Sequence, residues 1–246
     1  MDSILLANQV DLDKIKYGAV KTNAVGGKSI YLSHNGGPLI VQTPEMRCPF
    51  GLTKWDNKKD GGEEKETYKY DLLLGFDGMD KRDAVSSLFK KIDGLDKKLK
   101  VDGMENSMGW LGKKITSDLV IDELYTPMVR HSRDKNTGEI TDKYPPTFKV
   151  TVPYRDGKFQ CEVYDQNDTE VDPAGLNLQG ARCMVIMQCT GIWVVGKKYG
   201  CSWKVLQMKV SPRSNIPKNA FRQIEDKVPD DEEVVDSDDE LEGGKR

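Results

Sequence analysis

The chain of 246 residues is long enough to bury a core, and 37 Lys and Arg nearly balance 40 Asp and Glu. The balance hides an asymmetry, because residues 230–242 carry nine acidic side chains while residues 1–229 carry 35 basic against 31 acidic ones. The first residues include no basic segment before a long apolar run, and no stretch reaches eighteen apolar residues, so we expect neither a signal peptide nor a membrane span.

The five cysteines include no CxxC pair, and most of them lie in apolar, strand-like segments. Buried, reduced thiols fit this pattern better than a disulfide framework. We therefore expect an intracellular protein in a reducing compartment.

The first half of the chain predicts strands followed by helices. Residues 1–27 are expected to be an irregular lead-in, and "KSIYLSHNGGPLIVQTP" predicts two strands around an Asn-Gly-Gly turn. "TYKYDLLLGF" predicts another strand. A helix is expected over roughly 81–100, because apolar residues recur there at steps of three and four. "TSDLVIDELYTP" predicts a second, short helix.

The last third is rich in strand signals. "TFKVTVPY" and "KFQCEVYD" flank an Arg-Asp-Gly turn, and "ARCMVIMQCTGIWVV" and "CSWKVLQMKV" flank "GKKYG", with a bulge or bend expected at Gly191. About seven strands in one domain predict a mainly β, OB-fold-like Greek-key barrel over residues 28–212, with a helical insertion near 81–125. Residues 213–246 are expected to be a linker and a disordered acidic tail.

Motifs for catalysis or for a metal are missing from the sequence. "AVGGKS" has Thr22 where a phosphate-binding loop needs its first Gly, and "DNKKDGG" has Lys58 at the third ligand position of a calcium loop. The two histidines, His34 and His131, have no nearby residues to complete a metal site or a nucleophile arrangement. We therefore expect no enzyme, no metal and no cofactor.

Aromatic and basic residues gather instead in three groups near strand ends and hairpin tips. Unpaired bases stack on aromatic rings while nearby cations hold the phosphates, so such groups are typical of single-stranded nucleic-acid binding. For any one of these rings, core packing is equally open. Tyr164 lies on the polar face of its strand, and Trp203 points opposite to Leu206, Met208 and Val210, which favours exposure. The candidate contacts are Trp193, Lys197, Lys198, Tyr199, Trp203, Lys204, Tyr154, Arg155, Lys158, Tyr164, Arg47, Lys54 and Trp55.

The C-terminal third, with "TFKVTVPYRDGKFQCEVYD", "ARCMVIMQCTGIWVVGKKYGCSWKVLQMKV" and the acidic tail, resembles the OB-fold single-stranded-DNA-binding proteins of phages and large DNA viruses. "LIVQTPEMRCPFGL" resembles the algal-virus and African swine fever virus type. The resemblance spans roughly residues 28–212. It implies sequence-independent binding of single-stranded DNA in viral replication, recombination or repair. The implied location is the viral replication site in the host cytoplasm or nucleus. The resemblance also implies the last hairpin, from Trp193 to Lys204, as the main contact.

The tail is expected to compete with DNA for the basic groove and, once displaced, to reach viral replication proteins. Simple solubility is an equally open role. A structural or internal virion protein is the alternative function, while RNA binding and a homodimer are left open. The tail's acidic residues are Asp230, Asp231, Glu232, Glu233, Asp236, Asp238, Asp239, Glu240 and Glu242.

Overall fold

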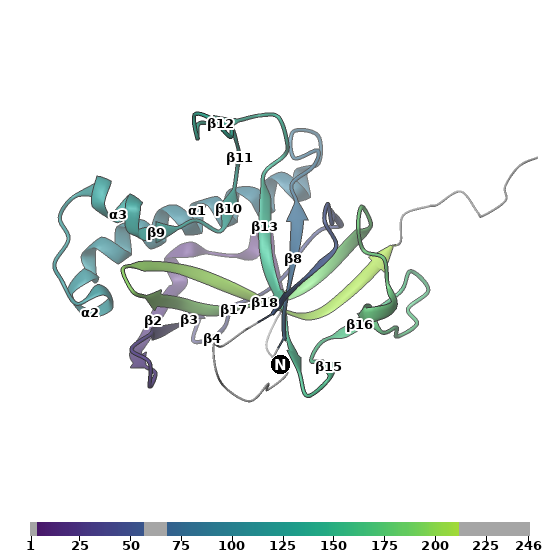
Figure 1. The fold of residues 1–246 in the computed structure, drawn as a ribbon, viewed down its shortest axis with the longest axis horizontal. Helices are drawn as coiled ribbons and strands as arrows, with labels where there is room; N and C mark the ends of the chain where they lie inside the picture. Colours follow the sequence, from purple (N-terminus) through teal and green to yellow (C-terminus); the bar gives the residue numbers. More distant parts are fainter. Residues whose placement is uncertain (1–3, 57–67, 212–246) are drawn as a thin grey trace, which may run out of the picture. The chain divides into compact units, whose positions relative to one another are not determined.

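The computed structural model describes residues 4–56 and 68–211. Five strands of this part close a barrel in the order β6–β8–β13–β18–β17 and back to β6. Figure 1 labels β8, β13, β17 and β18 of this barrel. All neighbours pair antiparallel except β13 and β18, which are parallel. This is the strand order of an OB fold, so the predicted mainly β barrel is confirmed. The strands are β6 (Met46–Arg47), β8 (Tyr68–Gly75), β13 (Thr147–Val152), β17 (Arg182–Val195) and β18 (Lys198–Ser211).

Period-two alternation explains how the barrel closes over its core. Phe148, Val150 and Val152 on β13 are fully buried, whereas Lys149 and Thr151 between them point outward. β8 follows the same rule, since Leu72 and Leu74 are buried. These side chains belong to one continuous apolar cluster that also includes the helical face described next.

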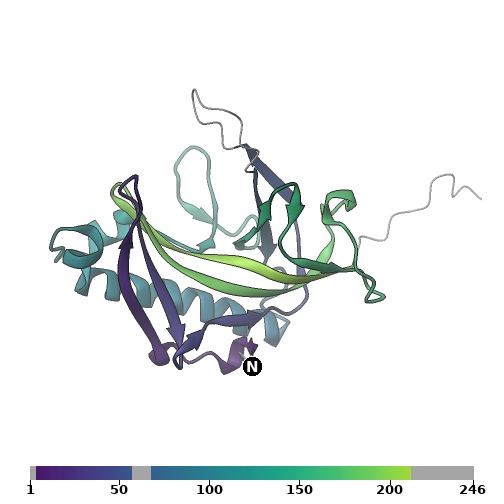
Figure 2. The ribbon, with the colours of Figure 1, turned by 90° about the horizontal axis from the view of Figure 1, so that it is seen from below.

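The helical insertion lies between β8 and β13, as expected. α1 (Asp83–Glu105) continues five residues past the predicted end at 100, and α2 (Ser107–Leu111) and α3 (Asp118–Leu124) follow. The apolar stripe of α1 faces the core, and Figure 2 shows the helix running along one side of the β17–β18 hairpin. None of the described helices is long and apolar enough to cross a membrane.

β17 and β18 extend beyond the barrel to form what we call the arm, which consists of residues 191–202 together with β2, β3 and β9. β3 (Lys28–His34) pairs with β17, β2 (Ile15–Thr22) pairs with β3, and β9 (Tyr125–Thr126) pairs with β18. The expectation that residues 1–27 are irregular is therefore wrong for β2. Its sequence, "IKYGAVKT", gave no strong strand signal, and pairing with β3 supplies the order that the local pattern lacks.

Gly191 lies where the arm leaves the barrel, and the bend predicted there is confirmed. Its φ is +110°, and the register of β17 against β18 shifts between Cys189 and Gly191. A Cβ at this position would lie 2.3 Å from the carbonyl oxygen of Ile30 on β3. Glycine is needed both for the backbone angle and for the close approach of β3.

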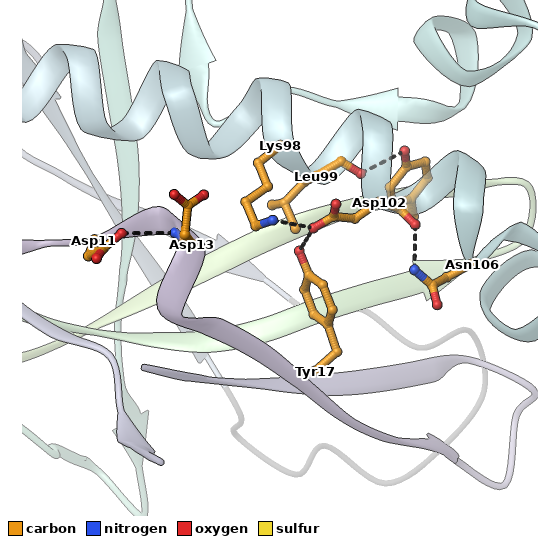
Figure 3. A network of polar contacts seen from close by, with 8 residues as sticks. Asp11, Asp13, Tyr17, Lys98, Leu99, Asp102 and Asn106 are labelled. Carbon is orange, nitrogen blue, oxygen red and sulfur yellow. Dashed lines mark hydrogen bonds and ion pairs between the residues drawn. The ribbon is translucent and has the colours of Figure 1, made fainter. Parts of the chain in front are cut away.

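Two polar connections fix α1 against the arm. The hydroxyl of Tyr17 on β2 donates to Asp102, which also pairs with Lys98 Nζ at 3.2 Å (Figure 3). Asp96 is buried and accepts hydrogen bonds from the Tyr125 hydroxyl at 2.5 Å and from the backbone N–H groups of Met128 and Val129. Burial raises the pKa of Asp96, while these hydrogen bonds favour its charged form.

Short elements complete the described part. The Asn35-Gly36 and Asp156-Gly157 turns both have positive φ at each central residue, which suits two-residue hairpins. The remaining strands are β1 (Leu5–Leu6), β4 (Gly37–Pro38), β5 (Ile40–Gln42), β7 (Leu52–Asp56), β10 (Val129–Arg130), β11 (Ser132–Arg133), β12 (Ile140–Thr141), β14 (Tyr154–Arg155), β15 (Lys158–Phe159) and β16 (Glu162–Tyr164). Single 3-10 turns are formed by Ala7–Gln9, Leu12–Lys14 and Pro173–Gly175.

Candidate nucleic-acid interface

Two adjoining hollows on the outer face of the barrel form what we call the trough. One, of about 490 Å³, lies between β13, β18 and the β14–β15 hairpin, and the other, of about 390 Å³, lies over β7, β8 and β13. Lys69 lines both, so the two adjoin at this side chain. The lining residues are Thr53, Trp55, Lys69, Asp71, Leu73, Arg130, Lys149, Thr151, Val152, Pro153, Tyr154, Arg155, Gln160, Lys204, Val205 and Leu206.

Sheet register sets the floor of the trough. Thr53 on β7 is opposite Asp71 on β8, Asp71 is opposite Thr151 on β13, and Thr151 is opposite Lys204 on β18. Side chains of directly paired residues share one face of a sheet, so these four form a polar row across four strands. Lys69, two residues before Asp71, lies opposite Trp55 and extends the same face.

Positive charge dominates the trough. Asp71 is the single acidic residue among the lining residues, and its side chain is only 5% exposed. It accepts hydrogen bonds from Lys149 Nζ at 3.0 Å and from Thr151 Oγ1 at 3.2 Å, which compensates its buried charge. The other cations make no ion pair with any described residue. The five cationic lining residues are Lys69, Arg130, Lys149, Arg155 and Lys204.

Each of the two hollows has one aromatic residue in its lining, Trp55 in the smaller and Tyr154 in the larger. Trp55 on β7 is 55% exposed, although an indole of its size is usually largely buried. Tyr154 is half-buried and held by neighbouring rings, with centroid distances of 5.1 Å to Tyr70 and 4.9 Å to Phe159. A ring fixed in this way loses little conformational entropy when a ligand stacks on it.

The trough therefore combines aromatic side chains with ammonium and guanidinium groups, the two kinds of group found in sites for single-stranded nucleic acids. Each stacked base contributes on the order of 1–3 kcal/mol in such sites, without sequence preference. The outer face between β8, β13 and the loops after the first and fourth barrel strands is also where OB folds bind oligonucleotides. Four of the residues singled out in the sequence are brought together here: Trp55, Tyr154, Arg155 and Lys204.

Trp203 requires a correction, because it is buried with only 2% of its surface exposed. Its indole nitrogen donates to Met128 Sδ at 3.2 Å, and its ring packs against Phe148. The expectation of exposure assumed unbroken alternation from Trp203 to Leu206. Ile186 pairs with Gln207 but Met187 pairs with Val205, so Leu206 is an extra residue that reverses which side chains face inward.

Tyr199 requires the same correction, since none of its side chain is exposed. Its hydroxyl donates to the carbonyl oxygen of Leu99 on α1 at 3.3 Å. Gly103 on α1 makes room for it, because a Cβ there would lie 2.3 Å from the tyrosine hydroxyl. Neither buried ring offers a face to a base.

The remaining candidates lie outside the trough. Lys197 is exposed at the arm's turn, and Lys198 Nζ donates to the carbonyl of Glu123. Trp193 is half-buried on the arm. Lys158 is exposed on β15, and the hydroxyl of Tyr164 donates to Glu162 at 2.9 Å, which raises the pKa of Tyr164.

Arg47 and Lys54 are likewise apart from the trough lining. Arg47 is exposed on β6 and pairs with Asp77 at 3.6 Å. Lys54 is exposed and alternates with Thr53 and Trp55 along β7, which places it on the opposite face of that strand. The acidic tail, from Asp230 to Glu242, lies outside the described residues.

Sequence reasoning missed Lys69, Arg130 and Lys149. A usable signal existed for two of them, because each alternates with core residues in "TYKYDLLLGF" or "TFKVTV" and so had to face outward. Arg130 joins the group because β10 pairs with β13, which places Arg130 opposite Thr147. No local pattern pointed to it.

Comparisons with known proteins give three results. No curated protein matches the chain. Among solved structures, gp2.5, a single-stranded DNA binding protein encoded by bacteriophage T7, is similar with 10% identity and a TM-score of 0.40, covering 75% of this chain and 98% of its own. The single-stranded DNA-binding protein of bacteriophage Enc34, solved with ssDNA, has 11% identity and a TM-score of 0.43, covering 80% and 95%. Residues 79–222 match a family model, and the chain therefore belongs to the family of unknown function DUF5871.

Proposed function

We propose that the protein binds single-stranded DNA along the trough, without marked sequence preference and without catalysis. The observation that carries the proposal is that Trp55 and Tyr154 line the same trough as the cations Lys69, Arg130, Lys149, Arg155 and Lys204. Bases stack on the two rings, and Lys69, Lys204 and the neighbouring guanidinium groups neutralise the phosphates between them.

Single strands fit this chemistry better than duplexes. In a duplex the base faces are stacked on one another, so an exposed ring such as Trp55 gains nothing from them. The trough's polar row consists of two threonines, one paired carboxylate and one lysine, which is too small a set for base-edge readout at several positions. Binding is therefore governed by stacking and charge, and it weakens as salt rises.

The test is a titration of the full chain with labelled oligothymidylate of about 16 nucleotides, the upper end of one OB fold's usual range. Duplex DNA and RNA of equal length are measured in parallel over a salt series. We expect the single strand to bind most tightly among the DNA forms, with log affinity falling by about 0.7 per neutralised phosphate for each unit of log salt.

The test variant combines Trp55→Ala with Lys69→Ala inside the trough. Its matched control is Lys90→Ala on the exposed side of α1. The trough variant should bind weakly, and Lys90→Ala should bind as the unchanged protein does. Equal binding of duplex and single strand, or no binding at any salt concentration, would overturn the proposal. The RNA arm decides whether the 2′-hydroxyl is tolerated.

We further propose that the acidic tail competes with the strand for the trough, as a tethered polyanion at high effective concentration. Deleting residues 230–246 should then tighten binding at low salt and have little effect at high salt, where screening removes the competition. Unchanged affinity at low salt would leave the tail with solubility alone. A role in replication or repair follows only if the strand-displaced tail captures replication proteins, which a pull-down with and without oligothymidylate would measure.

A further inference from the structure

The outer face of the arm continues the outer face of the barrel. Along β18, Tyr199, Cys201 and Trp203 are buried on the inward side, so Gly200, Ser202 and Lys204 lie on the outward side. Trp193 pairs directly with Gly200 and therefore shares the face of Lys204. Gly200, the partner of Trp193, and Lys204 are about 13 Å apart along β18.

The indole of Trp193 extends over Gly200. A Cβ at Gly200 would lie 2.7 Å from Cζ2 and 3.1 Å from Cε2 of Trp193, so the glycine is what lets the ring approach the backbone of β18 this closely. The residue is half-buried, with the strand beneath it and part of its surface accessible. An indole held against a sheet in this way is a fixed platform for stacking.

A second ring and a cation lie beside this platform. Ser29 on β3 is the partner of both Trp193 on β17 and Lys21 on β2, so the three share one face. Tyr31, two residues further along β3, is on that face as well and is 55% exposed. The Lys21 ammonium lies 5.0 Å from the centroid of the Tyr31 ring, a cation–π arrangement that holds both side chains over the sheet.

We propose that Tyr31, Trp193 and Lys21 form a second contact region for the same polynucleotide, on the arm. A strand that fills the trough continues past Lys204 and Ser202 onto this region. The inference rests on the proposed function and deepens it, because it assigns the site a greater length than the barrel alone provides. Its chemistry repeats that of the trough, with ring faces for bases and an ammonium group for a phosphate.

Tryptophan fluorescence can isolate the arm. The chain has four tryptophans, and Trp110 and Trp203 are buried, which leaves Trp55 in the trough and Trp193 on the arm as accessible reporters. Trp55→Phe keeps a ring for stacking and makes Trp193 the one accessible indole. This variant is titrated with oligothymidylates of about 4 and about 16 nucleotides, the two ends of the OB-fold range.

We expect both oligomers to bind by anisotropy, with quenching of Trp193 by the longer one and not by the shorter one. Tyr31→Ala combined with Lys21→Ala should weaken binding of the longer oligomer at least about fivefold and leave the shorter one unchanged. Both side chains are exposed, so this variant should fold normally, and Lys90→Ala serves as the charge control.

The outcomes separate the two proposals. Binding of both oligomers with no change in Trp193 emission and no effect of the arm variant would overturn the arm contact while the trough stands. Equal quenching by the short oligomer would also overturn it, since the short strand should not reach the arm. Failure of both oligomers to bind would remove the proposed function and this inference with it.

Discussion

The inward and outward faces of the β17–β18 hairpin carry similar residues in opposite surroundings. Inward, Trp203 and Tyr199 are buried, and the polar atom of each has a partner on a neighbouring element. Outward, Trp193 is half-buried beside a glycine, and Lys204 lines a hollow. Aromatic content alone therefore does not identify a binding surface, because one hairpin supplies the core with the rings of Tyr199 and Trp203 on β18 and the proposed DNA contacts with Trp193 on β17.

If that division is right, the largest effect should come from the inward side. Trp203→Ala should lower the free energy of unfolding by about 3–5 kcal/mol, because it leaves a large cavity beside Phe148. Urea denaturation of the variant and of the unchanged protein measures the difference. A loss below about 1 kcal/mol would mean that the indole is not the core residue described here.

Asp96 tests the inward side through its polar contacts. Asp96→Ala removes the acceptor for the Tyr125 hydroxyl and for two buried backbone N–H groups, so we expect a loss of stability of at least about 2 kcal/mol. Thermal unfolding followed by circular dichroism provides the measurement. Below the transition the variant should still bind oligothymidylate, and a large change in affinity in the folded state would contradict the separation of the two faces.

Trp55 tests the outward side. Trp55→Ala should weaken binding of single-stranded DNA by about 1–3 kcal/mol, the value of one stacked base, and change stability little because the ring is more than half exposed. Anisotropy titration and denaturation of the same preparation give both quantities. Loss of stability with intact binding is the reverse pattern and would place Trp55 in the core.

The smallest effect is expected from single cations. Lys204→Ala should reduce the dependence of log affinity on log salt by about 0.7, the share of one phosphate on a single strand. Lys90→Ala removes the same charge from α1 and should leave the slope unchanged. Equal slopes for the two variants would indicate that net charge, and not the trough, governs binding.

Part of this structure could be predicted from the sequence. The α1 stripe, the two glycine turns and the Gly191 bend were predictable, since each depends on local pattern or on a backbone angle that few residues adopt. The burial of Trp203 was not, because one extra residue at Leu206 reverses the alternation and only the register with β17 shows it. The burial of Tyr199 could not be predicted for a different reason, since Gly103, which makes room for its ring, is almost a hundred residues earlier in the chain.

The candidate site was predictable in part. Trp55, Tyr154, Arg155 and Lys204 stood out as aromatic and basic residues near strand ends, and the barrel brings them to one face. Lys69 and Lys149 were hidden inside strands whose apolar residues drew attention to the core, although alternation assigns them outward. Assembling three separate groups into one trough requires the parallel pairing of β13 with β18, which no local pattern specifies.

Protection of lysines from acylation is the most direct test that single-stranded DNA lies in the trough. The full chain is acylated with and without saturating oligothymidylate, and each lysine is quantified by mass spectrometry. The account predicts strong protection of Lys69 and Lys204 and none of Lys90 and Lys97, which lie on the exposed side of α1. Uniform protection of all four, or protection confined to the α1 lysines, would contradict it.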